Sequence, residues 1–358
     1  MPFLFTDEQR QISREARRLL SEIYSGERLK ALLETEGGFD HAFWAACQEM
    51  GWTGITVAEA HGGLGLSAVE LCLIALECGR VAAGAPFLAT SYAVSEALRL
   101  WGDAELSAAH LPGLATGELK GAACLNPDAG LRFEGGRVHG AAGWIVGGAA
   151  ADVAVVLARD PEARLLLVDL RGGRVRRTPR VALDNTRCVA DLRFDGAAAT
   201  ALGAGDSLAA AADLRQRLAI VTAFEQLGGA ETCMETARDY ALQRHAFGQP
   251  IGKFQAIKHK IAEMFVLNEL ARGNALRAAL SLADDAPDLA LRAGCARLSA
   301  IAAYEYAAAE AIQVHGALGV TWEHDLHLHY RRARATATEL GSRADWEDLV
   351  VDVLSEAA

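Results

Sequence analysis

The chain has 358 residues, of which 51% are hydrophobic and 23% charged, so it holds enough apolar material for two or three domains. The formal net charge is -11 and the sequence contains no long block of Lys and Arg, which excludes non-specific binding of nucleic acid. No apolar run reaches the ~18 residues of a membrane span, and the N-terminus predicts a capped helix rather than a signal sequence. The seven scattered cysteines indicate reduced, mostly buried thiols. We therefore expect a cytoplasmic protein that binds neither nucleic acid nor membrane.

Residues 1–115 are predicted to form helices. Thr6 followed by Gln9 is a capping box ahead of an amphipathic stretch. Ser67 is placed to cap a later helix, and a glycine turn at residues 61–65 lies between the two. Three tryptophans of this region are expected in the protein core rather than at a cofactor: Trp44, Trp52 and Trp101.

From about residue 118 the pattern changes to short strands. Val153–Leu157 and Leu165–Leu170 are apolar runs bounded by turn residues, and Val189–Phe194 alternates between apolar and polar positions. Gly135-Gly136 and Gly172-Gly173 lie where hairpin turns are expected. This region is predicted to be a β-domain.

Long helical patterns return after Gly205. They cover about 207–245, 253–283 and 287–318, and a fourth helix starts near Asp325 with a possible break at Gly341-Ser342. Long helices joined by short loops predict an antiparallel four-helix bundle. The chain is thus expected to be a multidomain α+β protein. Its predicted domains are an all-α domain (1–117), a middle β-domain (118–204) and a helix bundle (205–358).

The strongest motif is Arg-His-Ala-Phe-Gly-Gln-Pro-Ile-Gly-Lys-Phe-Gln, residues 244–255, between the first two bundle helices. The Arg244 fork suits a pyrophosphate, the Phe247 ring can pack on an isoalloxazine or adenine, and Gln255 can bond a ribityl or phosphate oxygen. An ordinary helix connection with an exposed arginine is the alternative interpretation.

This motif, RxxFGxxIGxFQ, closely resembles the acyl-CoA dehydrogenase family. A second segment, residues 313–332, is similar to the family's turn that touches the FAD of a neighbouring subunit. It carries Gln313 and Gly316, with Ala317 in place of a usual glycine. A third match, at residues 51–65, resembles the family's first helical domain. The resemblance spans nearly the whole chain and implies a barrel-like β-domain that holds FAD and a coenzyme A thioester.

The β-domain departs from the family pattern. Leu125–Leu131 replaces the usual segment of flavin contacts and lacks its Glu and Ser. The second usual contact is present as Trp144-Ile145-Val146, without the family's hydroxyl. By resemblance, Trp144 is expected to contact the flavin, although some flavin hydrogen bonds are supplied differently or are weaker.

The catalytic base is not at a usual position. The reaction implied by the resemblance needs a carboxylate to remove the α-proton of the thioester while the β-hydride goes to the flavin. The two positions that hold this Glu in the family correspond to Leu218 and Leu340. Glu225 lies two turns after Leu218 on the same helix face and is the first candidate, with Glu339 second. The alternative for Glu225 is a structural carboxylate.

The implied function is FAD-dependent α,β-dehydrogenation of an acyl-CoA, with electrons passed to an electron-transferring flavoprotein by a dimer or tetramer. The short chain resembles the branch of the family that acts on steroid side chains and other bulky acyl-CoAs. Some members of that branch form α2β2 tetramers with one catalytically incomplete subunit, so the alternative is a non-catalytic partner subunit. A metal site at His324, His327 and His329 is a weaker alternative, because these residues lie inside the family motif.

Overall fold

The computed structural model describes residues 5–83 and 90–356, which fall into two compact units, each taken by itself. One unit contains Met1–Gly26, Cys72–Ala83 and Ala219–Ala358, and the other contains Glu27–Leu71 and Gly84–Leu218. The expected three-domain division at residues 117 and 204 stays a prediction. Across the described residues, no helix has both the length and the apolarity that crossing a bilayer requires.

In the described part of the N-terminal region, every regular element is a helix, as predicted. Thr6 and Gln9 form the expected capping box, with each side chain bonded to the other residue's backbone N–H. Ser67 accepts a hydrogen bond from the Val69 N–H at 3.1 Å, at the start of the fourth helix. The elements are α1 (Asp7–Ile23), α2 (Gly26–Leu33), α3 (His41–Glu49), η1 (Trp52–Gly54), η2 (Glu59–His61), α4 (Ala68–Arg80), α5 (Tyr92–Trp101) and α6 (Ala104–Thr116).

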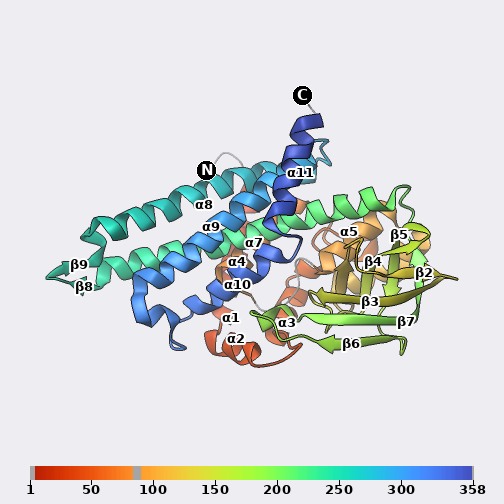
Figure 1. Ribbon diagram of the computed structural model, residues 1–358, viewed down its shortest axis with the longest axis horizontal. Coiled ribbons are helices and arrows are strands. Elements are labelled where there is room, and N and C mark those ends of the chain that lie inside the picture. Colours follow the sequence, from red (N-terminus) through yellow and green to blue (C-terminus); the bar gives the residue numbers. More distant parts are fainter. Residues whose placement is uncertain (1–4, 84–89, 357–358) are drawn as a thin grey trace. The chain divides into compact units, whose positions relative to one another are not determined.

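The strands form a closed ring of pairings, which gives the middle region its barrel-like form. In this ring β4 pairs with β2, β2 with β3, β3 with β7, β7 with β5, and β5 again with β4. Strand β1 adds to β4. Strand β6 adds to β7 (Figure 1). The strands are β1 (Gly121–Cys124), β2 (Arg132–Glu134), β3 (Arg137–Ile145), β4 (Val153–Asp160), β5 (Glu162–Asp169), β6 (Val175–Pro179) and β7 (Ala190–Ala201), with η4 (Asn185–Arg187) before the last.

The two continuous apolar runs of the sequence are strands buried on both faces. Along β4, residues such as Val155 pack into a core shared with α5 and α6, whereas the residues between them, such as Val156, pack into the core inside the ring. Strand β5 divides its side chains between the same two cores, through Leu167 and Leu166 for example. Because neither face meets solvent, these strands show no polar alternation.

One predicted hairpin is confirmed and the other is wrong. Gly135 and Gly136, with φ of +56° and +75°, form the two-residue turn between the paired strands β2 and β3. Gly172-Gly173 also lies between two strands, but β5 and β6 do not pair with each other. Both pair with successive parts of β7, so the two glycines make a bend along one edge of β7 rather than a hairpin.

The C-terminal region is the expected helix bundle. Helices α8, α10 and α11 all contact α9 (Figure 1). The third helix begins at Leu289, two residues later than predicted, and Asp288 is its N-cap, so Pro287 precedes the helix instead of starting it. The predicted break is confirmed at Gly341, whose φ is +106°. The elements are α7 (Ser207–Gln243), β8 (His245–Ala246), β9 (Gln249–Pro250), η5 (Ile251–Lys253), α8 (Gln255–Ala283), α9 (Leu289–His315), η6 (Gly316–Val320), α10 (Leu326–Thr338) and α11 (Arg343–Glu356).

The remaining expectations about buried side chains are also confirmed. Trp44 and Trp52 are buried, and Trp101 is half-buried against the core. All seven cysteines are free thiols, six of them buried and Cys295 partly so. The fold class predicted from the sequence is therefore confirmed.

Candidate functional site

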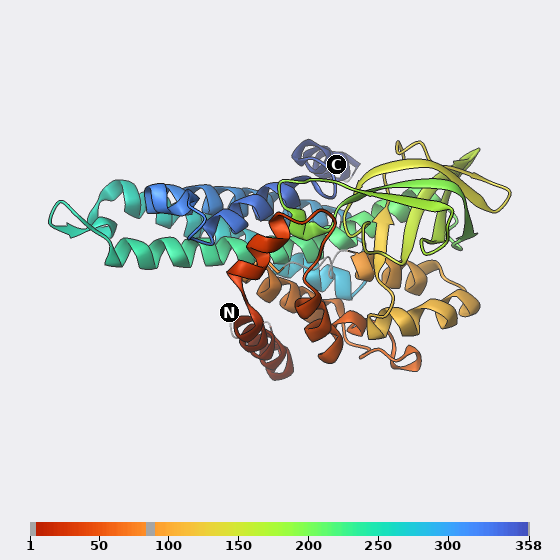
Figure 2. The same ribbon diagram turned by 90° about the horizontal axis from the view of Figure 1, so that it is seen from below.

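The connection between α7 and α8 is a hairpin with a two-residue turn. Phe247 and Gly248 form the turn with φ of +53° and +80°, the pattern of a type I′ turn. These angles suit glycine but strain a phenylalanine. The Ile251 N–H donates to the Arg244 carbonyl at 2.8 Å and closes the base of the hairpin. Figures 1 and 2 both show it at the tip of α7 and α8.

Three of the residues expected to contact the cofactor lie on this connection and point to solvent. Arg244 directly follows α7, Phe247 is 95% exposed at the turn, and Gln255 is the first residue of α8. The ring of Phe254 lies edge-on to Phe247, with centroids 6.0 Å apart. Among the described residues, none hydrogen-bonds or pairs with the Arg244 guanidinium. A guanidinium with no partner and an exposed aromatic ring on the same connection fit a ligand that has both a pyrophosphate and flat rings.

The second predicted segment lies at the same end of the bundle. Gln313 is exposed in the last turn of α9, and Gly316 ends that helix at φ +63° and ψ -140°, a conformation open to glycine only. The His315 ring stacks on Tyr240 with centroids 4.1 Å apart. The Tyr240 carbonyl in turn accepts the Arg244 N–H at 2.8 Å. A ring stack thus connects the helix end that carries Gln313 and Gly316 to the one that carries Arg244, and its Tyr240 lies outside both sequence motifs.

Trp144 belongs to the other compact unit. It has φ of +58° and its side chain is 62% exposed, which is unusual for a large aromatic residue. Its N–H donates to Asp191 Oδ1 at 3.1 Å, and Asp191 is also paired with Arg180. An exposed indole on a backbone that is held by a hydrogen bond fits contact with a flat ring. Asp191 and Arg180 carry no signal in the sequence, because Asp191 lies in an ordinary strand pattern and Arg180 directly follows a strand.

Glu225, the first candidate for the base, is held by a buried arginine. Arg332 Nη1 donates to Glu225 Oε1 at 2.7 Å, and their side chains are 1% and 4% exposed. Arg332 Nη2 also donates to the carbonyls of Ala82 and Ala83, in the turn that follows α4. This arrangement favours the structural interpretation of Glu225, because the buried charge of Arg332 would be strongly destabilising without the Glu225 carboxylate beside it. Its role as a base stays a prediction.

The other positions considered for the base offer no exposed acid. Leu218 is 1% exposed. Leu340 and Glu339 lie in the break between α10 and α11, and both are half-buried. Glu339 therefore stays the second candidate.

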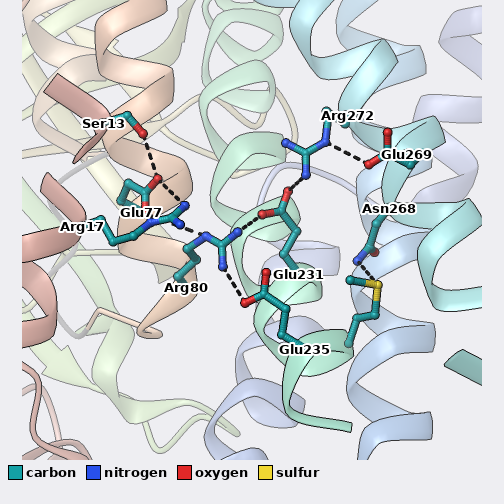
Figure 3. A network of polar contacts seen from close by, with 10 residues as sticks. Ser13, Arg17, Glu77, Arg80, Glu231, Glu235, Asn268, Glu269 and Arg272 are labelled. Carbon is teal, nitrogen blue, oxygen red and sulfur yellow. Dashed lines mark hydrogen bonds and ion pairs between the residues drawn. The ribbon is translucent and has the colours of Figure 1, made fainter. Parts of the chain in front are cut away.

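A cluster of charged side chains around two buried carboxylates links α1, α4, α7 and α8 (Figure 3). Arg80 contacts Glu231, and its Nη1 donates to Glu235 at 3.0 Å. The Glu77 and Glu231 side chains are 1% and 3% exposed, and burial raises the pKa of Glu231 although Arg80 and Arg272 oppose the shift. Each of these two buried carboxylates has arginine partners, so the cluster serves as a structural clamp between helices. Its members are Ser13, Arg17, Glu77, Arg80, Glu231, Glu235, Glu269 and Arg272.

The three histidines near the start of α10 have separate packing roles. His327 stacks on Trp322 with centroids 4.8 Å apart, and His329 Nδ1 shares a hydrogen bond of 3.0 Å with the Tyr304 hydroxyl. His324 Nδ1 accepts the Leu326 N–H at 3.2 Å. Within residues 5–83 and 90–356, no group of three or more His, Cys, Asp or Glu side chains is arranged to hold a metal ion.

Comparisons with known proteins agree with the motifs at both ends of the chain. The family model for the N-terminal domain of acyl-CoA dehydrogenases matches residues 6–118, and the model for the C-terminal domain matches residues 209–345. The acyl-CoA dehydrogenase IpdE2 of Mycobacterium tuberculosis is 32% identical over 337 residues, which cover 94% of each chain. The chain belongs to the acyl-CoA dehydrogenase family. Members of this family are flavin-dependent oxidoreductases that act on CH–CH groups of acyl-CoA thioesters.

Solved structures of the family share the whole fold. The ChsE4-ChsE5 complex from Mycobacterium tuberculosis is 23% identical, with a TM-score of 0.90 over 99% of both chains. A variant of the Tcur3481-Tcur3483 steroid acyl-CoA dehydrogenase is 24% identical, with a TM-score of 0.88 over 98% of both chains. At these identities the likeness concerns the fold alone.

Proposed function

We propose that the chain binds FAD and takes part in the α,β-dehydrogenation of an acyl-CoA thioester to the trans-2-enoyl-CoA, with electrons passed to an electron-transferring flavoprotein. The observation that carries the proposal is the exposed set of Arg244, Phe247 and Gln255 on one strained hairpin in a member of a flavin-dependent family. FAD, when bound, supplies the acceptor for the hydride that leaves the β-carbon. A bulky, steroid-derived acyl group is the proposed substrate class, because IpdE2 and the steroid acyl-CoA dehydrogenase are among the similar proteins.

The residues of this chain bind and orient the cofactor in this proposal. Arg244 holds the pyrophosphate by charge-assisted hydrogen bonds, Phe247 packs on a ring, and Gln255 bonds a ribityl or phosphate oxygen. Gln313 and the backbone at Gly316 approach the FAD of a neighbouring subunit. Trp144 lies against the flavin ring.

A second candidate function is a non-catalytic partner subunit in a heteromeric α2β2 enzyme. One specific observation favours it: leucine occupies both usual base positions, and Glu225 is bonded to Arg332 in the core. Such a subunit would complete the FAD site of a sister chain, which would supply the base. Two of the similar solved structures, ChsE4-ChsE5 and Tcur3481-Tcur3483, are each named for two different proteins.

Purification of this chain alone, followed by a visible spectrum, tests the two candidates. A working enzyme should be yellow and lose its flavin absorbance when an acyl-CoA is added without oxygen. A colourless, folded protein that becomes yellow only when co-expressed with a related dehydrogenase chain would support the partner subunit. If flavin binds neither to this chain alone nor to this chain co-expressed with a related chain, both candidate functions are contradicted.

A further inference from the structure

Strands β3 and β7 contain a bulge at Trp144. Ala142 pairs with Leu192 and Ile145 pairs with Ala190, so Gly143 and Trp144 on β3 together face one residue of β7. That residue is Asp191. A bulge interrupts the ladder of backbone hydrogen bonds and re-aims a side chain. The Trp144 N–H donates instead to the carboxylate of the facing residue, with a nitrogen-to-Oδ1 distance of 3.1 Å.

The Asp191 carboxylate is itself held on its other side. Its Oδ2 accepts hydrogen bonds from Arg180 Nε at 2.8 Å and from the same guanidinium's Nη2. The Arg180 N–H is bonded to the Val189 carbonyl at 3.0 Å, which fixes the residue that follows β6. The hydrogen bond from Arg180 lowers the pKa of Asp191, so the side chain stays a carboxylate at neutral pH.

Two further features show that the local structure is built around this contact. Trp144 is in the left-handed region, which is strained for a residue with a large side chain and needs support from its surroundings. Gly143 leaves room for the carboxylate, because a Cβ on this glycine would lie 3.2 Å from Asp191 Oδ1. Trp144 therefore has a fixed backbone and a side chain that is 62% exposed.

We propose that Asp191, aligned by Arg180, is a positioning residue that holds Trp144 in the conformation in which its indole meets the flavin. This inference rests on the proposed function, because it takes the flavin as the ring that Trp144 meets. Asp191 acts only through Trp144 and touches no reacting atom.

The test follows the Trp144 side chain directly, in the flavin-free protein. The protein is labelled with fluorotryptophan, and Trp144→Phe identifies the Trp144 signal among those of the six tryptophans in the fluorine NMR spectrum. Asp191→Ala should shift or broaden this signal, whereas Asp191→Asn, which keeps an acceptor oxygen, should largely preserve it. Asp195→Ala is the matched control, since Asp195 is an exposed aspartate on the same strand.

The second measurement is FAD affinity by titration of the same proteins. Asp191→Ala should weaken FAD binding about tenfold, because losing the hydrogen bond to the Trp144 N–H lowers by about that factor the population of the conformation that meets the flavin. Asp191→Asn and Asp195→Ala should stay close to the unmodified protein. If Asp191→Ala does not fold, Gly143→Ala replaces it, because the added Cβ crowds the carboxylate while Asp191 remains.

The outcomes separate the inference from the function beneath it. An unchanged Trp144 signal in both Asp191→Ala and Gly143→Ala overturns the positioning role, whatever the affinities are. A second outcome is a changed Trp144 signal in Asp191→Ala, with FAD affinity in both Asp191→Ala and Trp144→Ala equal to that of the unmodified protein. The bulge would then remain a structural finding, but Trp144 would lie outside the flavin site. That result contradicts the inference and the proposed contact together.

Discussion

Arg332 and Glu225 form an ion pair within the helical unit, with Arg332 Nη1 2.7 Å from Glu225 Oε1 and both side chains almost fully buried. The second terminal nitrogen of Arg332 donates to two carbonyls in the turn that follows α4. One guanidinium therefore joins α10 to α7 and to the turn after α4. A carboxylate held in this way has one oxygen already occupied, which makes a role in stability testable against a role as a base.

Glu225→Gln separates these two roles. We expect it to lower the free energy of unfolding by about 3 kcal/mol, because the Arg332 charge stays buried without its counter-charge. We expect flavin reduction by acyl-CoA to stay within a few-fold of the unmodified rate. Urea unfolding and anaerobic stopped-flow reduction at matched flavin content measure the two effects. A rate lower by ~10²–10⁴ at unchanged stability would identify Glu225 as the base.

The double variant Glu225→Leu with Arg332→Met is the control for this ion pair. Removing both charges leaves no unpaired ion in the core, so most of the lost stability should return. A double variant that is as unstable as Glu225→Gln would mean that the helices depend on the shape of these side chains or on the Arg332 hydrogen bonds to the Ala82 and Ala83 carbonyls, rather than on the charge pair.

Arg244→Ala should release FAD. The exposed guanidinium is proposed to hold the pyrophosphate, and the loss of a charge-assisted contact costs about 1.5–3 kcal/mol of binding free energy. Flavin per chain after gel filtration is the measurement. Arg238→Ala is the matched control, because Arg238 is an exposed arginine of α7 that pairs only with its neighbour Asp239 in the described structure. Equal flavin content in both variants would remove Arg244 from the cofactor site.

Much of the fold could be read from the sequence because the deciding interactions are local. The capping box at Thr6, the diglycine turn at Gly135 and the break at Gly341 depend on residues a few positions apart. The error at Gly172 has a different cause. Its bend is set by the pairing of β5 and β6 along β7, and no pattern in the bend itself distinguishes that arrangement from a hairpin.

The site could be read only in part, because its supporting contacts join residues far apart in the chain. Arg244 and Phe247 stand in a recognisable motif. Arg332 pairs with a residue 107 positions away, and Asp191 contacts Trp144 across 47 positions. A buried arginine and a surface arginine look alike in a sequence, since the difference lies in what folds against them.

His329 should make the protein less stable in mild acid. Burial lowers the pKa of this side chain from 6.5 to about 4 in the folded protein. The unfolded chain therefore binds a proton that the folded protein does not, and stability falls as the pH drops from 6.5 towards 4. The slope from one such proton is about 1.4 kcal/mol per pH unit. Urea unfolding between pH 7.5 and 4.5 should show that the free energy of unfolding falls less steeply with decreasing pH in His329→Gln than in the unmodified protein. Identical slopes in the two proteins would contradict the lowered pKa of His329.

Arg80→Met should destabilise the helical unit, and more so at high pH than at low pH. The change leaves Glu231 with Arg272 and removes the charged partner of Glu235, at an expected loss of about 3–5 kcal/mol near pH 8. Burial already raises the pKa of Glu231, and removing Arg80 raises it further, because Arg80 opposes that shift. As the pH falls, Glu231 in the folded variant takes up a proton and no longer needs a cation, so part of the loss should disappear by pH 5.5. Urea unfolding at the two pH values, with Arg238→Ala as the exposed-pair control, measures the difference. A loss of equal size at both values would show that Glu231 stays charged without Arg80.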